Sequence, residues 1–287
     1  MWALIVGEGA LRQHWHKFAP KTYTVPQLFA CLVLKEFLKA DYRKVWALLK
    51  ECPELGATIG LTEIPHFTTL QQAFKRLLEG RRVQRLLDET VLLAKQIRIL
   101  PSRSDLAALD GTGLESTTAS RYYVRRAEKQ GKRRTYTTYR DFPKIGVVAD
   151  CRSHLVLAVV HDRGPSPDIT HFRQALDQAQ RRLGVRTLLA DGGYDSEASH
   201  RYAREHHGVR SLIPAKIGRA TAKRLSGKHR QVMRERIHLS RYNQRAQVET
   251  TISMLKRLLG SALRARTHAN QRREAALKAI TLNIMIL

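Results

Sequence analysis

Two short apolar segments of this chain end in the same way, with an aspartate followed directly by a glycine. They are residues 106–111, LAALDG, and residues 188–192, LLADG. Short apolar runs that end in turn residues are typical of strands buried in a sheet. An aspartate at the carboxyl end of such a strand lies where α/β sheets bind their ligands. A single Asp-Gly pair would be better explained by a turn, but two at matching strand ends favour a shared site formed by Asp110 and Asp191.

The sequence around these aspartates alternates between strand and helix patterns, beginning after Pro101 and Ser102. Two β-rich runs joined by a short polar turn predict a hairpin, and helical patterns separate the later strands. This order indicates the ribonuclease-H-like α/β fold, in which helices cover a mixed sheet. The predicted strands are 106–110, 144–149, 155–161, 187–191 and 209–214, and the predicted helices are 170–183, 196–207 and 244–262.

Residues 1–100 have a different pattern, which predicts helices throughout. Thr24 and Asp41 each precede an apolar-periodic stretch, as helix-capping residues do. Thr68 and Gln71 have the spacing of a capping box, which predicts that Thr68 caps a further helix.

The change of pattern divides the chain into a helical N-terminal region, residues 1–100, and an α/β domain, residues 101–287. Helices in the first region would suit either a DNA-binding module or a plain helical packing domain. The connector from 52 to 67 is too long for a helix-turn-helix turn of about 3–4 residues, so both interpretations stand.

The chain carries 51 lysines and arginines against 25 aspartates and glutamates, a net charge of +26. Such an excess indicates a polyanionic partner, and nucleic acid is the first candidate because each neutralised phosphate releases condensed counterions. A ribosomal protein would show the same balance. Three widely spaced cysteines form no Cys-x-x-Cys pair, which argues against a zinc knuckle or a disulfide framework.

The sequence contains no apolar run long enough to span a membrane, and its first ten residues do not resemble a signal peptide. We therefore expect a cytoplasmic protein without a membrane partner. In a prokaryotic cell, its DNA partner would associate it with the nucleoid.

Three stretches concentrate the positive charge. Between the first two predicted strands, the insertion 111–143 has eight basic residues against three acids, with four interleaved tyrosines. Residues 214–245 have ten against one, and residues 256–273 have six with no acid. A solvated face would mix both signs, so these stretches predict DNA contacts. Within the insertion the candidate contacts are Arg125, Arg126, Lys132, Arg133 and Arg134.

Four polar side chains recur at helical spacing near the end of the chain. Tyr242, Arg245, Glu249 and Lys256 project within roughly 60° of one another on an ideal helix. The apolar stripe beside them consists of Val248, Ile252, Leu255 and Leu259. Arg245 and Glu249 are also an i,i+4 pair, so a solvated salt-bridge ladder is the alternative to a functional site.

Asp110, Asp191 and Glu249 together have a chemical purpose. Magnesium prefers oxygen ligands and retains several waters, so one or two carboxylates hold each ion beside substrate phosphates. Two such ions can activate the attacking oxygen and stabilise the leaving oxygen of a phosphoryl transfer. We expect Mg²⁺ as the cofactor, with Mn²⁺ able to replace it, while Arg245 and Lys256 orient and neutralise phosphates.

Four further acids near predicted strand ends compete for the metal: Asp150, Asp162, Asp168 and Asp195. Asp195 has a second explanation, because it precedes the predicted helix 196–207 and is placed to cap it. The twelve histidines show no zinc-binding spacing.

Three motifs resemble those of bacterial and archaeal insertion-sequence transposases of the DDE class: Asp110-Gly-Thr, Asp191-Gly-Gly-Tyr and Tyr242-(2)-Arg245-(3)-Glu249-(6)-Lys256. The spacing of the last motif matches in full, and the resemblance covers about residues 60–287. It implies a ribonuclease-H-like catalytic domain in which the three acids are metal ligands. It also implies that Tyr242, Arg245 and Lys256 contact the DNA of the transposon ends.

The resemblance further implies an activity. In this family, water attack nicks donor DNA at the element ends, and the freed 3′ hydroxyl is then joined to target DNA. The implied partner is double-stranded DNA, bound by a homodimer assembled on it. Family members often carry a β-rich insertion before the third acid, whereas only 57 residues separate Asp191 from Glu249 here.

Two alternatives keep the same fold. One is a ribonuclease-H-like nuclease without strand transfer, against which the Tyr-Arg-Glu-Lys spacing argues. The other is an inactive or domesticated, transposase-derived DNA-binding protein, against which the presence of all three acids argues.

Overall fold

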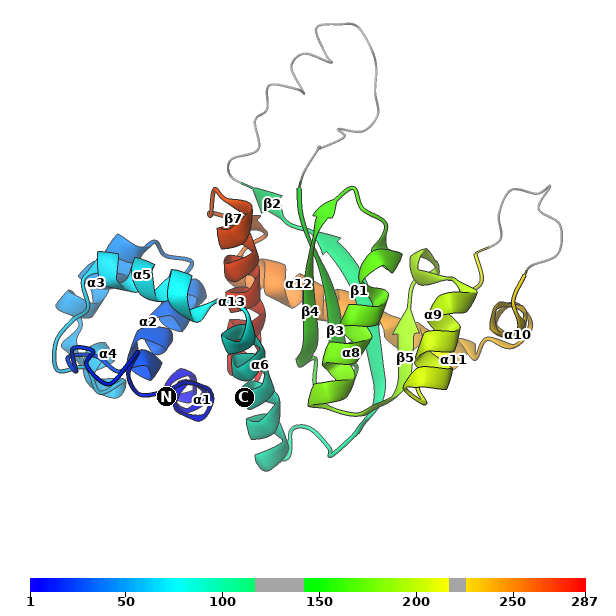
Figure 1. The fold of residues 1–287 in the computed structure, drawn as a ribbon, viewed down its shortest axis with the longest axis horizontal. Coiled ribbons are helices and arrows are strands. Elements are labelled where there is room, and N and C mark those ends of the chain that lie inside the picture. The colour runs from blue at the N-terminus through cyan, green and yellow to red at the C-terminus, as the bar shows by residue number, and fades with distance from the viewer. Residues whose placement is uncertain (117–141, 217–225) are drawn as a thin grey trace, which may run out of the picture.

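The computed structural model describes residues 1–116, 142–216 and 226–287. A sheet lies near its centre, with a group of short helices on the N-terminal side and longer helices against the sheet itself (Figure 1). The candidate DNA contacts of the expected insertion lie outside the described residues: Arg125, Arg126, Lys132, Arg133 and Arg134.

The central sheet has five strands in the order β4-β3-β1-β5-β6. They are β1 (Ser104–Gly113), β3 (Phe142–Asp150), β4 (Val156–Gly164), β5 (Val185–Ala190) and β6 (Arg210–Leu212). β3 and β4 form the predicted hairpin and β3 runs antiparallel to β1, whereas β5 and β6 continue parallel to β1. This mixed sheet covered by helices confirms the predicted ribonuclease-H-like α/β fold. β1 continues to Gly113, beyond the residue at which the sequence predicts its end.

Alternation along the strands gives the sheet two apolar faces. The helices on them are α8 (Phe172–Arg182), α12 (Ala246–Leu259) and α13 (His268–Ile286). On one face, Ala107 and Leu109 share a core cluster with Phe172 of α8. On the other face, Ala108 belongs to the cluster that contains Val248 and other buried residues of α12 and α13. Successive residues of β1 therefore point alternately to α8 and to α12: Ala107 and Leu109 face α8, and Ala108 faces α12.

The N-terminal region consists of α1 (Trp2–Ala10), α2 (Val25–Phe37), α3 (Tyr42–Glu51), α4 (Pro53–Thr58), α5 (Phe67–Leu77) and α6 (Arg81–Gln96). Thr24 caps α2 through a capping box and Asp41 caps α3, as predicted. The prediction for Thr68 is wrong. The helix already begins at Phe67, and the Thr68 hydroxyl lies 2.8 Å from Nδ1 of His66 instead of capping the backbone.

The end of the chain differs from its predicted form. The expected helix 244–262 is found as α12 (Ala246–Leu259), preceded by the short helix α11 (Leu239–Tyr242) and the 3-10 turn η4 (Asn243–Arg245). α12 stops before Gly260, whose φ of +91° suits glycine. α13 was not predicted, because its buried residues lie all around the helix and leave no single stripe. Within the described ranges, no helix combines the length and apolar character needed to cross a membrane.

The remaining described elements are β2 (Glu115–Ser116), η1 (Asp168–His171), η2 (Gly192–Tyr194), α9 (Glu197–Arg201), η3 (Tyr202–His206), α10 (Lys228–Arg236) and β7 (Ala262–Leu263). β2 and β7 pair in a small second sheet next to α13.

A buried ion-pair network joins the N-terminal helices to α13. Glu36 of α2 lies 2.8 Å from Nζ of Lys278 and 3.3 Å from Nζ of Lys35, and all three side chains are buried. Lys278 also donates a hydrogen bond to the carbonyl of Leu259, the last residue of α12. One acid thus balances two buried lysines where three helices meet.

Replacing this acid tests the network. Glu36→Gln should lower the free energy of unfolding by about 3–5 kcal/mol, because it leaves Lys278 buried without a counter-charge. The matched control is Glu205→Gln, which removes an exposed pair with Arg201 and should change stability by less than about 1 kcal/mol. Chemical denaturation measures both, and equal small effects would show that the network carries no net electrostatic stabilisation.

Candidate active site

Asp110 and Asp191 lie side by side at the ends of two neighbouring strands. β1 and β5 are parallel, and their register ends with Leu109 opposite Ala190, so an aspartate follows directly on each strand. The residue two places before each aspartate packs in the core cluster of α12. Because side chains alternate along a strand, both carboxylates are directed to the face that α12 covers.

The carboxylate of Asp110 lies in a field of mixed charge. Its side chain is 22% exposed, and Oδ1 accepts a hydrogen bond of 2.9 Å from the Gly111 N–H. Burial raises the pKa of Asp110, and the charges of Glu249 and Asp191 raise it further, while the Gly111 N–H and Arg245 lower it. The three acids singled out by the sequence are therefore close enough to influence one another.

Arg245 connects the third acid to the first. Its Nη2 lies 2.5 Å from Oε1 of Glu249 and its Nη1 lies 3.8 Å from Oδ2 of Asp110. Arg245 ends η4, which packs over β1 and β5, and Glu249 follows in the first turn of α12. The Glu249 side chain is 52% exposed, so this edge of the site is open to solvent.

Tyr242 faces the same group. Burial raises the pKa of its hydroxyl, the charges of Asp191 and Asp110 raise it further, and a side-chain hydrogen bond with Arg245 opposes them. Tyr242 ends α11, so the four residues of the stripe lie on three consecutive helical elements, α11, η4 and α12, rather than on one regular helix. The structure nevertheless brings Tyr242, Arg245 and Glu249 together beside the two aspartates.

Lys256 lies farther along α12 and contacts β1. Its Nζ donates a hydrogen bond of 2.7 Å to Oγ1 of Thr112. Thr112 is two residues beyond Asp110, on the same face of the strand. Lys256 is thus held beside the carboxylates by a strand residue, and no acid in the described part of the chain pairs with it. Thr112 belongs to the Asp110-Gly-Thr motif, but its contact with Lys256 was not predicted, because it depends on β1 continuing past Asp110.

A fourth carboxylate, Asp168 of η1, lies on the opposite side of β1. A Cβ at Gly111 would collide with Oδ1 of Asp168, and one at Gly193 would lie 3.5 Å from its Oδ2 and 4.0 Å from Oδ2 of Asp191. Gly111, which follows Asp110, therefore leaves room for this side chain, whereas a Cβ at Gly193 would only be in ordinary contact with it. The sequence identified Asp168 only as one of four competing acids, because nothing in the pattern predicts where η1 folds.

Two buried groups surround Asp168. Nζ of Lys144 lies 2.6 Å from its Oδ1, and the lysine side chain is 11% exposed. The Tyr194 hydroxyl has its pKa raised by burial and further by Asp168, Asp110 and Asp191, so it stays protonated among three carboxylates. Lys144 and Tyr194 thus supply positive charge and a hydrogen-bond donor to the side of the site away from α12.

Two of the other competing acids stabilise the fold. Asp150 accepts hydrogen bonds from the Ser104 hydroxyl, at 2.6 Å, and from the Ser153 N–H, at 2.8 Å. The side chain of Asp195 is buried and pairs with Arg230 at 2.7 Å. The prediction that Asp195 caps the next helix is wrong, because Ser196 caps α9. The third, Asp162, accepts hydrogen bonds from Ser166, Thr170 and the Arg163 N–H.

The donor set at this edge suits a divalent metal ion. Three carboxylates from β1, the start of η2 and α12 lie in one another's field, which a cation would relieve. Among the described residues, no three histidine, cysteine, aspartate or glutamate side chains form a compact ligand group, and the guanidinium of Arg245 pairs with Glu249. Asp110, Asp191 and Glu249 are the residues that could hold a metal.

Comparison with known proteins gives one match. A family model described as the transposase DDE domain matches residues 101–284, more than half of the chain. The matched range contains the whole central sheet and the candidate residues Asp110, Asp191 and Glu249. Neither a curated protein nor a solved structure matches the chain.

The two glycines beside Asp168 give a matched pair of variants. Gly111→Ala should lower the free energy of unfolding by about 1–3 kcal/mol, because its Cβ overlaps Asp168 and displaces the ion pair with Lys144. Gly193→Ala places its Cβ at ordinary contact distance, so stability should change by less than about 1 kcal/mol. Urea denaturation of both variants checks this, and equal effects would mean that Asp168 is free to move away.

Proposed function

This chain belongs to the transposase DDE-domain family, and from that premise we propose that it cuts DNA at the ends of an insertion sequence and joins the freed 3′ hydroxyl to target DNA. One observation carries the proposal. Asp110 and Asp191 follow paired residues of neighbouring parallel strands, and Arg245 links Asp110 to Glu249. Three acids from distant parts of the sequence thus meet on one face of the sheet.

Asp110, Asp191 and Glu249 would hold Mg²⁺, with Mn²⁺ able to replace it. When bound, such ions activate an attacking oxygen and stabilise the leaving oxygen in an in-line displacement at phosphorus. Carboxylate oxygens suit both cations, which prefer hard oxygen ligands. Asp168, paired with Lys144, lies on the other side of β1 and would add a further carboxylate near the metal.

Arg245 has two functions in this proposal. Its guanidinium neutralises Glu249 and reaches Asp110, which keeps these carboxylates close despite their mutual repulsion. Its planar group of N–H donors also suits a phosphate, to which arginine can bind through two parallel hydrogen bonds. Arg245 would therefore exchange a carboxylate partner for a DNA phosphate as the substrate arrives.

Lys256 and Tyr242 would position the DNA end. The Thr112 hydroxyl holds Lys256 at a fixed place on the face that carries the acids, where its ammonium group can bind a phosphate beside the cleaved one. Tyr242 adds a protonated hydroxyl next to Arg245.

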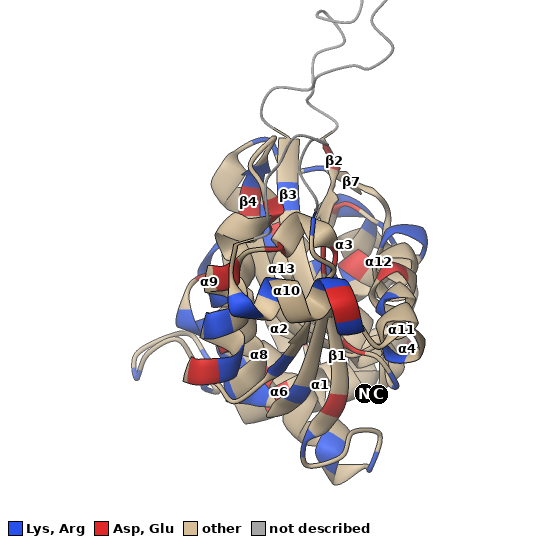
Figure 2. Ribbon diagram, turned by 90° about the vertical axis from the view of Figure 1, so that its right-hand side faces the viewer, with Lys and Arg blue, Asp and Glu red and all other residues tan. Residues whose placement is uncertain are grey.

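The wider surface supports double-stranded DNA as the partner. The side of the molecule that carries α9, α10 and α11 shows lysines and arginines on several elements (Figure 2). We propose that two copies assemble on the DNA, as implied for the family, and that the protein acts at the nucleoid in the cytoplasm. The positive charge would make DNA binding strongly dependent on salt.

The first test replaces each acid with its isosteric amide. Asp110→Asn, Asp191→Asn and Glu249→Gln should each abolish cleavage of a labelled linear DNA that carries the element's own ends, because the amides cannot hold the metal. Gel-shift affinity for the same DNA should hardly change. The control is Asp105→Asn, an exposed acid on the same strand that pairs with Arg241 and should cleave normally. Near-wild-type cleavage by any of the three would remove that residue from the site.

The second test separates a transposase from a plain nuclease. Lys256→Ala should lower nicking and joining at element ends about tenfold or more, because one charge-assisted contact to the end is lost. Lys256→Arg should keep part of the activity, since the charge survives. Cutting of unrelated DNA, if measurable, should stay the same. If Lys256→Ala leaves end-specific cleavage unchanged, the lysine serves only to bind Thr112, and the transposase proposal loses its most specific support.

A further inference from the structure

The guanidinium of Arg245 is engaged by the acids of the candidate active site. Its Nη2 lies 2.5 Å from Oε1 of Glu249, and its Nη1 lies 3.8 Å from Oδ2 of Asp110. The side chains of Arg245 and Asp110 are each 22% exposed, so this contact is largely shielded from water. One positive charge thus faces two of the three carboxylates that would hold the metal.

This single charge is shared among all the partners of Arg245. Arginine binds a phosphate most strongly through two parallel N–H···O hydrogen bonds from one edge of its planar group. Both terminal nitrogens, Nη1 and Nη2, face carboxylates in this structure. A DNA phosphate that binds the guanidinium therefore weakens its attraction to Glu249 and to Asp110.

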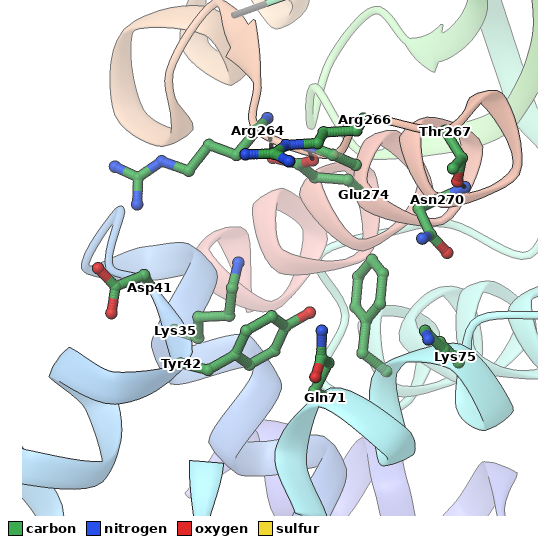
Figure 3. Close-up of a pocket in the computed structure, with 12 residues that line it drawn as sticks. Lys35, Asp41, Tyr42, Gln71, Lys75, Arg264, Arg266, Thr267, Asn270 and Glu274 are labelled. Atoms are coloured by element: carbon green, nitrogen blue, oxygen red, sulfur yellow. Dashed lines mark hydrogen bonds between the residues drawn. The ribbon is translucent and has the colours of Figure 1, made fainter. Parts of the chain in front are cut away.

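A carboxylate outside the site shows how acids are held when they only organise the fold. Glu274 lies on the wall of a cavity of about 300 Å³ between the N-terminal helices and α13 (Figure 3). It accepts hydrogen bonds from the backbone N–H groups of Arg264, at 3.0 Å, and Ala265, at 2.9 Å. Backbone donors stay in place, whereas Arg245 reaches Glu249 with a long side chain that has alternative rotamers. The pairing in the active site can therefore be exchanged.

Lys256 lies on the same face of the sheet but is held differently. Its Nζ donates a hydrogen bond of 2.7 Å to the hydroxyl of Thr112, and no acid of the described residues pairs with it. A neutral acceptor positions the ammonium group without neutralising it. Of these two cations, Arg245 alone has to leave an acid before metal and DNA are both bound.

We propose that Arg245 couples metal binding to DNA binding. Without DNA, the guanidinium stays against Asp110 and Glu249 and opposes a divalent cation there, because like charges repel. A DNA phosphate draws the guanidinium away and so raises the affinity of the acids for the cation. Thermodynamic linkage makes the coupling reciprocal, so the cation raises the affinity for DNA by the same factor. This regulation rests on the proposed function, and it limits metal-dependent cutting to DNA that has reached Arg245.

Metal affinity without DNA tests the first half of the proposal. The probe is Mn²⁺, whose unbound ion gives a sharp electron paramagnetic resonance signal during a titration of the whole chain. Arg245→Gln should bind Mn²⁺ at least about fivefold more tightly than wild type. Arg245→Lys keeps the charge and should stay closer to wild type than to Arg245→Gln.

Lys256→Gln is the matched control, because it removes the same charge without breaking an acid pair. It lies about 10 Å beyond Glu249 along α12, where water and salt screen its charge, so Mn²⁺ affinity should rise by about twofold at most. Equal tightening in Arg245→Gln and Lys256→Gln would show a general effect of charge and overturn the proposal. Weaker Mn²⁺ binding by Arg245→Gln would also overturn it, because the guanidinium would then organise the acids.

A further variant separates this proposal from the proposed function. Asp110→Asn/Glu249→Gln should lose the Mn²⁺ binding that Arg245→Gln strengthens. If this double variant binds Mn²⁺ as wild type does, the acids do not hold the metal, and the metal site of the proposed function fails together with the coupling. If it loses binding while Arg245→Gln matches wild type, the coupling alone fails.

The second half needs DNA that cannot react. The probe is a duplex of the element end that stops at the cleavage site and carries a 3′ dideoxy terminus, so neither cleavage nor joining takes place. Saturating duplex should tighten Mn²⁺ binding by wild type at least about fivefold, and saturating Mn²⁺ should tighten duplex binding, measured by fluorescence anisotropy, by the same factor. In Arg245→Gln this factor should shrink toward one. An equal factor in wild type and Arg245→Gln would show that the coupling does not pass through Arg245.

Discussion

The parallel pairing of β1 with β5 is the constraint on which the rest of the site depends. Register places Asp110 and Asp191 next to each other, and strand alternation directs both to the face of α12. The same alternation directs Gly111 toward Asp168 and Thr112 toward Lys256. A shift of one residue in either strand would reverse all of these directions, so the buried alanines and leucines of the two strands fix the chemistry as well as the fold.

Gathering acids on one face has an electrostatic cost that the surrounding residues offset. Arg245 is shared between Glu249 and Asp110, and Lys144 pairs with Asp168 behind the sheet. Arg245 of η4 and Lys144 of β3 lie on other elements than Asp110 of β1 and Asp168 of η1, so the charge balance depends on tertiary folding. The pairing between Glu36 and Lys278 repeats this arrangement away from the site, and it joins the N-terminal helices to the long C-terminal helix.

The sequence predicted those features that local pattern determines. Apolar runs ending in Asp-Gly located two strands and two acids, and helical spacing placed Glu249 and Arg245 beside an apolar stripe. It failed where tertiary contacts decide. α13 is buried all around and so has no stripe, Asp195 is bound by a distant arginine instead of capping a helix, and Asp168 lies at the site only through the path of η1. Family membership rests on the match over residues 101–284.

The central claim is that Asp110, Asp191 and Glu249 together hold divalent metal beside DNA. Anomalous scattering from Mn²⁺ in crystals of the protein bound to its element-end DNA tests it most directly. The account predicts anomalous density between the Asp110 and Asp191 carboxylates and the DNA phosphate, with Glu249 completing the ligand set and Arg245 on the DNA. Manganese density at other side chains, with none in contact with Asp110 and Asp191, would contradict it.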